Sequence, residues 1–410
     1  MKTWLYALVA GLFFWGQTER VYAAYTETLL PDGLSVNLRT DYGVDGRGTA
    51  DDSAELQQAI DDLAGQGGGR IDIPAGKYRL AGVKLESNVH LFISKDAVLY
   101  PVLNKSRKGA VIFTMGMGAG RIANTSIRGA DGKFTVEMPG GGVRAKFLVI
   151  CNVENFLIEN FHIKDNLSVF SSISLNPYLE RPALYAMPEN GAIHNGSVTG
   201  AQYGYGLIQA QAGRSVYFEN LSGEGGVTLR LATGEKEMND KQYGGLWDIT
   251  AKDIQCKDGY AALLLGPHSM NNGVVVADGI RAEGCAFAMK GSDGFVSKKQ
   301  RTSGLKPGKF APGTCVKNIH AVFGTHAQLK TKDIRYLPEA TRNYIRKKTE
   351  SWGQVCRGPS VTGVLLYGDT IKVEKVTYEG FVGHPPVIRR EDVLFSDAGN
   401  RMAEKKDTLD

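Results

Sequence analysis

The chain has 410 residues, of which 42% are hydrophobic and 22% are charged, and this composition excludes wholesale disorder. Its 51 glycines make up about 12% of the residues, against a usual level of about 7%, but they have no three-residue period, which excludes collagen. The formal net charge of +5 is too small to indicate a nucleic-acid partner. These numbers describe a globular protein whose chain turns unusually often.

Residues 1–24 contain the parts of a secretory signal peptide. Lys2 precedes an apolar stretch from Trp4 to Trp15, and the small residues Ala23 and Ala24 follow. The apolar stretch is too short to span a bilayer of roughly 30 Å as a helix. We therefore expect a secreted or periplasmic protein that does not bind membranes, with a buried N-terminal strand as the alternative.

The next segment has the features of an end cap. Residues 42–63 begin with turn-forming residues and continue as an amphipathic pattern, in which Leu56, Ile60 and Leu63 fall at helical spacing. A repetitive β-protein needs such an atypical end unit to shield its first strands. We predict that residues 25–85 form an N-terminal cap helix and the first coils.

Between residues 86 and 395 one pattern recurs, in which a short β-rich run, an Asn or Asp and a second apolar alternation follow one another. The copies are centred on Asn160, Asn195, Asn220, Asp253, Asp278 and Asn318. Twenty-five residues separate Asn195 from Asn220, and 25 separate Asp253 from Asp278. Such a period with polar corners indicates an all-β parallel β-helix, whereas the strands of a β-sandwich recur every 8–12 residues and keep no such unit in phase.

Two basic stretches interrupt this pattern, one near residues 294–313 and the other, which looks helical, near residues 333–352. We expect both to be insertions on the β-helix. A single charge run is usually a solvated face, but two of them on one secreted solenoid favour an anionic polysaccharide as the partner. Residues 396–410 form a polar C-terminal tail.

The five cysteines include no Cys-x-x-Cys motif, so we expect no zinc site. One disulfide bridge, involving Cys315 or Cys356, remains an open alternative. We expect a monomer without a cofactor, although a bound anion or structural cation is left open.

Side-chain alternation identifies a candidate surface. In residues 226–234, the apolar side chains at 227, 229 and 231 share one face, so those at 230, 232 and 234 point outward. Strands of successive coils stack roughly 4.8 Å apart, which brings outward residues of equal position together. The residues that we expect on one outer surface are Gln209, Arg230, His268 and Lys290.

Two resemblances sharpen this prediction. The segment YGVDGRGTADDSAELQQAI, at residues 42–60, resembles the N-terminal cap of the pectate-lyase-like superfamily of right-handed parallel β-helices. Residues 205–290, with GLIQAQAG, GGVTLRLATG and LLLGPHSMNNG, resemble the iota-carrageenase family, glycoside hydrolase family 82. This second resemblance implies an enzyme that cuts a sulfated galactan by endo-hydrolysis of its β-1,4 bonds, with inversion.

The same resemblance implies roles for individual residues. Gln209 corresponds to a glutamine that helps to hold the water or a bound anion, and His268 to a histidine that contacts the substrate. On this surface, Arg230 and Lys290 are expected to face sulfate groups of the substrate.

The family's catalytic Glu-x-Asp pair falls on Ala232 and Gly234 in this chain. Inverting hydrolysis needs one carboxylic acid and one carboxylate, and neither residue supplies one. Glu235 is our candidate for a displaced acid, which requires a bulge or the end of the strand. Candidates for the base are Glu224, Glu237 and Asp240. The alternatives are a catalytically inactive sulfated-glycan-binding β-helix, and a hydrolase or lyase for another polyanionic polysaccharide.

Overall fold

The computed structural model describes residues 25–30, 32–103, 109–118, 120–181, 184–350 and 353–394. The predicted signal peptide and C-terminal tail therefore lie outside the described residues. Within the described part of the chain, no helix has the length and apolar character needed to cross a membrane.

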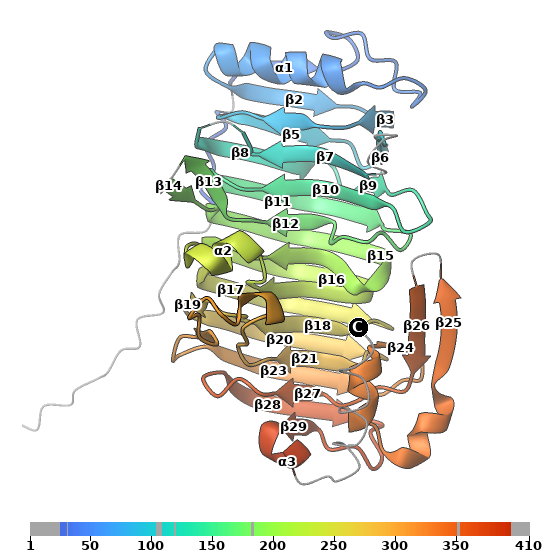
Figure 1. Ribbon diagram of the computed structural model, residues 1–410. Coiled ribbons are helices and arrows are strands. Elements are labelled where there is room, and N and C mark those ends of the chain that lie inside the picture. Colours follow the sequence, from blue (N-terminus) through green and yellow to red (C-terminus); the bar gives the residue numbers. More distant parts are fainter. Residues whose placement is uncertain are drawn as a thin grey trace, which may run out of the picture.

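The chain forms the predicted right-handed parallel β-helix, and 22 of its strands belong to one continuous sheet (Figure 1). Each complete coil contributes to three faces, and its strands pair in parallel with those of the next coil. The strands that form only the first face are β1 (Ser35–Asn37), β2 (Gly69–Ile73), β5 (Val89–Ile93) and β8 (Ile122–Gly129). Those that form only the second face are β3 (Gly76–Leu80), β6 (Ala97–Pro101) and β9 (Phe134–Glu137).

Further along, one long strand per coil bends and serves both of these faces. These strands are β11 (Val153–Lys164), β15 (Glu189–Ala210), β16 (Gly213–Ala232), β17 (Leu246–Lys257), β20 (Val275–Glu283), β23 (Cys315–Val322) and β28 (Lys372–Glu379). The C-terminal parts of β15 and β16 continue into the third face, which carries the site described below. The other strands of the third face are β4 (Val83–Leu85), β7 (Gly109–Met115), β10 (Arg144–Ile150), β12 (Ile173–Leu175), β18 (Ala261–Gly266), β21 (Phe287–Gly291), β27 (Val364–Leu366) and β29 (Val387–Arg389).

The bend between the first two faces is the recurring polar corner. Asn160, Asn195, Asn220, Asp253 and Asn318 all have positive φ there, a conformation that Asn and Asp tolerate better than most residues. The prediction of a corner at Asp278 was wrong by one residue. Lys252 pairs with Asp278, so Gly279, with φ +74°, takes the corner position next to Asp253. Asp278 instead accepts a hydrogen bond from Asn318 of the next coil.

The inward and outward alternation is as predicted for Leu229 and Leu231, which are completely buried in the main core of the coils. The prediction was wrong for Val227, which is buried in a separate cluster together with Ala327 and Leu329 of the second insertion. Helix α1 (Ser53–Gly65) lies across the N-terminal end of the solenoid, as predicted for the cap (Figure 1). It buries Leu56, Ala59, Ile60 and Leu63 against the first coils.

Both basic stretches are insertions at the third face. The first contains a 3-10 turn, η1 (Lys298–Gln300), and strand β22 (Lys309–Phe310), which pairs with β19 (Asn271–Asn272). The second contains β24 (Ala327–Leu329), two 3-10 turns, η2 (Thr331–Tyr336) and η3 (Glu339–Tyr344), then β25 (Arg346–Glu350) and β26 (Gly353–Gly358). In Figure 1, α2 (Lys236–Lys241) and β19 lie at one side of the third face, and β24, β25 and β26 lie at the other.

The prediction of a helix over residues 333–352 was wrong. Pro338 has an extended ψ of 142° and separates the two short 3-10 turns. From Arg346 the chain is extended and pairs antiparallel with β26. Outside the solenoid there are also an antiparallel pair, β13 (Tyr178–Arg181) with β14 (Leu184–Ala186), and a terminal helix, α3 (Arg390–Leu394). All five cysteines, Cys315 and Cys356 included, are free thiols.

Candidate functional site

The outward residues of the third face stack as the alternation predicts. Gln209 of β15 is in register with Arg230 of β16, Arg230 with Leu264 of β18, and Leu264 with Lys290 of β21. Three of the four residues expected on one surface therefore belong to one column, which Leu264 interrupts. His268 follows the end of β18 by two residues, and its φ of +48° marks a sharp turn there.

The backbone of the preceding coil holds the side chain of Arg230. One of its terminal nitrogens donates a hydrogen bond to the carbonyl oxygen of Gly204, while its Nε is buried and has no partner among the described residues. Burial lowers the pKa of the guanidinium, and the neighbouring Tyr260 and Tyr205 oppose this effect. Arg230 is thus a cation whose hydrogen-bonding capacity is not fully used by the described residues.

Lys290 has a different environment from the one expected. It is 8% exposed, and its Nζ lies 2.9 Å from Asp333 Oδ1 and 2.7 Å from Tyr260 Oη. The Tyr260 hydroxyl donates to the other oxygen of Asp333 at 2.8 Å. Burial lowers the pKa of Lys290, and Asp333 counteracts this. The structure therefore places Lys290 in a closed ion pair that fastens the second insertion to β21, and not at an open surface.

Lys330, immediately before η2, is a cation that the sequence interpretation missed. Its Nζ lies 4.4 Å from the centre of the Tyr260 ring and 6.0 Å from that of Tyr203. Burial, followed by the charge of Arg230, lowers the pKa of Lys330 to about 7. The sequence signal was the basic stretch itself, but we placed its start at residue 333 and did not connect it with Arg230.

The positions of the expected carboxylate pair differ in their surroundings, because Ala232 is buried and Gly234 is exposed beside the His268 ring. Ala232 is 5% exposed at the end of β16. A Cβ atom on Gly234 would lie 2.9 Å from both Cε1 and Nε2 of His268, so the imidazole occupies the space that a side chain would need. The same ring packs on Phe295, with the ring centres 4.7 Å apart. Burial, and then Arg230, lower the pKa of His268, which keeps the ring neutral at neutral pH.

Glu235 begins helix α2 as its N-cap. Its carboxylate accepts hydrogen bonds from the backbone N–H groups of Glu237, at 3.1 Å, and Met238, at 2.5 Å. Strand β16 ends at Ala232, as a displaced carboxylate requires, but both contacts use Glu235 as an acceptor. Glu235 would have to leave this cap in order to protonate a substrate.

Two of the three candidate bases, Glu237 and Asp240, lie on helix α2, and the third lies on another face. Glu224 is in register with Lys257 on the second face, so it does not belong to this site. Asp240 forms an ion pair with Lys236 and accepts a hydrogen bond from Gln300. Glu237 is exposed in the first turn of α2.

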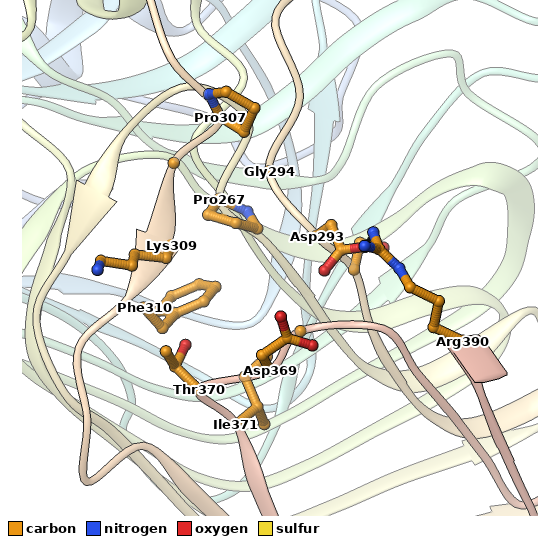
Figure 2. Close-up of a pocket in the computed structure, with 13 residues that line it drawn as sticks. Pro267, Asp293, Gly294, Pro307, Lys309, Phe310, Asp369, Thr370, Ile371 and Arg390 are labelled. Atoms are coloured by element: carbon orange, nitrogen blue, oxygen red, sulfur yellow. Dashed lines mark hydrogen bonds and ion pairs between the residues drawn. The ribbon is translucent and has the colours of Figure 1, made fainter.

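Beyond His268, the third face continues into a cavity of about 300 Å³ that the sequence did not indicate. Figure 2 shows Asp293, Asp369 and Lys309 around it, together with Arg390, which forms an ion pair with Asp293. The described residues contain no group of three or more His, Cys, Asp or Glu side chains arranged to hold a metal ion.

Comparison with known proteins agrees with this architecture. No protein-family model matches the chain. The iota-carrageenase of Zobellia galactanivorans is 34% identical, in a match that covers 84% of this chain and 82% of the relative. The chain belongs to the iota-carrageenase family. A second iota-carrageenase, from Alteromonas macleodii, is 30% identical over 81% of this chain and 79% of its own length.

The shared fold extends over nearly the whole of this iota-carrageenase family member. A solved structure described as iota-carrageenase complexed to iota-carrageenan fragments superposes with a TM-score of 0.81 at 27% identity. The match covers 90% of this chain and 93% of that structure. Membership in a family of glycoside hydrolases follows for the chain as a whole, while its chemistry depends on the residues described above.

Proposed function

We propose that this protein binds a sulfated galactan of the iota-carrageenan type across its third face and hydrolyses β-1,4 bonds of that polymer with inversion. The observation that carries the proposal is family membership over most of the chain, because two relatives named iota-carrageenase match 84% and 81% of it. Gln209, Arg230 and His268 at the third face support a site for an anionic sugar chain. Secretion by residues 1–24 belongs to the same proposal.

In this proposal Glu235 is the proton donor, and Asp240 of the same helix accepts the proton of the attacking water. Gln209 and His268 position water and substrate. Glu235 has to exchange its two backbone N–H partners for the leaving-group oxygen, which substrate binding next to α2 would drive. His268, neutral and fixed against Phe295, is suited to accept or donate one hydrogen bond to a sugar hydroxyl.

The packing of His268 against Gly234 favours a second candidate function. With no carboxylate at 232 or 234, and with Glu235 used as a helix cap, the same face is suited to binding a sulfated glycan without cutting it. In this second function, the protein binds the same ligand but catalyses no reaction.

One assay distinguishes these functions. Purified protein is incubated with iota-, kappa- and lambda-carrageenan and with polygalacturonate, and both reducing ends and the absorbance of unsaturated products are measured. The proposal predicts reducing ends from the iota form, lost in Glu235→Gln and kept in Glu237→Gln, a control on the same helix turn whose side chain is exposed.

Other outcomes would replace the proposal. Retardation of the protein in an iota-carrageenan gel, without any release of reducing ends, identifies the binding function. Absorbing products, or release from another polymer alone, identify a lyase or a hydrolase for a different polyanionic polysaccharide.

A further inference from the structure

Two buried thiols from successive coils meet at the corner between the second and third faces. Cys256 lies near the end of β17, and Cys285 follows the end of β20, the strand that pairs with β17 in the next coil. The two cysteines are 29 positions apart in the chain, and each is 3% exposed. Both side chains belong to the main apolar core of the coils.

The two sulfur atoms gather around Gly259. The backbone N–H of Gly259 donates a hydrogen bond to Cys285 Sγ at 3.3 Å. A Cβ atom on Gly259 would lie 2.5 Å from Cys256 Sγ, so this sulfur occupies space that only a glycine leaves open. Burial, and then a hydrogen bond with the Cys256 thiol, raise the pKa of Cys285. The two thiols are therefore direct neighbours.

The other three cysteines have different surroundings. Cys151 lies beside Lys146, and Cys315 lies among charged side chains of β20, β23 and β28. Cys356 belongs to the separate apolar cluster that includes residues of the second insertion. Among the five cysteines, all of which the structure describes, Cys256 and Cys285 are thus the pair placed for a reaction with each other.

We propose that Cys256 and Cys285 are the site of a disulfide bridge that joins successive coils in the protein matured outside the cytoplasm. Each thiol loses its proton and the two sulfur atoms form one S–S bond. A small-molecule disulfide, such as oxidised glutathione, takes up the two electrons and two protons and is cleaved to two thiols. Disulfides form and persist in oxidising compartments. That setting rests on the proposed secretion, whereas the contact between the thiols does not.

The burial of this pair determines when the bridge forms. The thiolate is the form that attacks a disulfide, and the raised pKa of Cys285 makes its thiolate scarce in the folded protein. At 3% exposure, neither cysteine is open to an oxidant from solvent. We therefore expect the bridge to form during folding, before the turn at Gly259 closes over the sulfur atoms, and to resist reduction afterwards.

The bridge adjoins the attachment of the second insertion. Gln328 of β24 donates a backbone hydrogen bond to the carbonyl oxygen of Gly259 at 3.1 Å. Arg357 of β26 donates to the carbonyl oxygen of Asp258 at 2.8 Å. A covalent link across this turn restricts the unfolded chain and fixes the segment to which the insertion is bound.

The test uses the purified full chain, which is reduced, unfolded in urea and refolded with a mixture of reduced and oxidised glutathione. The remaining thiols are alkylated in denaturant and counted by intact mass, and a non-reducing digest identifies linked peptides. In wild type we expect three of the five cysteines to be alkylated and the peptides of Cys256 and Cys285 to be linked.

Two variants provide the comparison. In Cys256→Ala, all four remaining cysteines should be alkylated, because Cys285 has lost its partner. Cys151→Ala is the matched control, since Cys151 is also 3% exposed. In this control the link should persist, so that two of its four cysteines are alkylated.

Urea unfolding of the two redox forms is a second measurement. The oxidised form should unfold at a higher urea concentration than the reduced form, because the bridge restricts the unfolded chain. This difference should vanish in Cys256→Ala and persist in Cys151→Ala.

Three results would overturn the proposal: five alkylated thiols in refolded wild type, a bridge to any other cysteine, or an oxidised form that is no more resistant to urea than the reduced one. The peptide map of wild type needs no variant, so it decides the question even if Cys256→Ala does not fold. Neither measurement involves a polysaccharide, and the outcome is therefore independent of the carrageenan assay.

Discussion

At the scale of single residues, the contact between His268 and Gly234 determines what chemistry the third face can perform. The imidazole fills the space beside Gly234, and its low pKa keeps it uncharged. Ala232 and Gly234 therefore do not simply lack carboxylates. Neighbouring side chains also occupy the space that larger residues at these positions would need. Any acid placed at 234 has to displace the outer edge of the His268 ring.

Restoring the carboxylates tests whether the third face still positions a substrate for cleavage. In the double variant Ala232→Glu/Gly234→Asp we expect reducing ends from iota-carrageenan to be released at least about 100-fold faster than by wild type, since each positioned acid or base contributes roughly 10²–10⁴-fold. The matched control is Ala232→Gln/Gly234→Asn, which has nearly the same volume without acids. Equal rates in the two double variants would show that the third face no longer positions the substrate for cleavage.

At the scale of elements, several buried contacts fasten the insertion formed by η2, η3 and β24–β26, and one of them is an ion pair. Asp333 of η2 reaches Lys290 of β21 and the Tyr260 hydroxyl, and all three groups are nearly inaccessible. An ion pair of this kind adds little net stability when intact, but removing one partner leaves a buried charge without compensation. The position of Lys330 depends on this contact, because Lys330 is three residues from Asp333.

We expect Asp333→Asn to destabilise the protein by about 3–5 kcal/mol, because Lys290 is left buried and unpaired. The measurement is the free energy of unfolding from urea denaturation followed by tryptophan fluorescence. In Lys290→Met/Asp333→Leu, where no charge remains, most of this loss should be recovered. A double variant as unstable as Asp333→Asn would mean that packing of the insertion, and not the charge, determines the effect.

At the scale of the whole molecule, each coil is stabilised by the coils next to it, and the first coil is stabilised by α1. In a solenoid each unit contacts only its neighbours, so the end unit has to be covered by something other than another coil. Helix α1 provides this cover with four completely or almost completely buried apolar side chains.

Shortening one of these side chains should weaken the entire end of the solenoid. We expect Ile60→Ala to lower the free energy of unfolding by about 2–5 kcal/mol, the usual range for a buried isoleucine, and to make the first coils more sensitive to limited proteolysis. Gln58→Ala, on the exposed side of the same helix, should change the free energy of unfolding by no more than about 0.5 kcal/mol. It should leave the sensitivity of the first coils to proteolysis unchanged. Equal effects of the two substitutions would show that α1 does not protect the first coils.

The fold could be predicted because its signals are local and repeated. Asn corners 25 residues apart and the alternation at Leu229 and Leu231 each depend on a few neighbouring residues. The stack of Gln209 on Arg230 followed from the same alternation. The surroundings of Lys290 could not be predicted in this way, because its partner Asp333 is separated from it by an insertion whose path no periodicity describes.

The register of the third face has one more consequence. Backbone pairing, and not contact between outward side chains, holds Gln209, Arg230, Leu264 and Lys290 in their column, although long insertions separate some of them in the chain. An outward residue of this column other than the ion-paired Lys290 can thus be exchanged by mutation without moving its neighbours. In evolution, a protein with this scaffold can lose a reaction, keep its ligand and acquire another reaction by such substitutions while it remains folded.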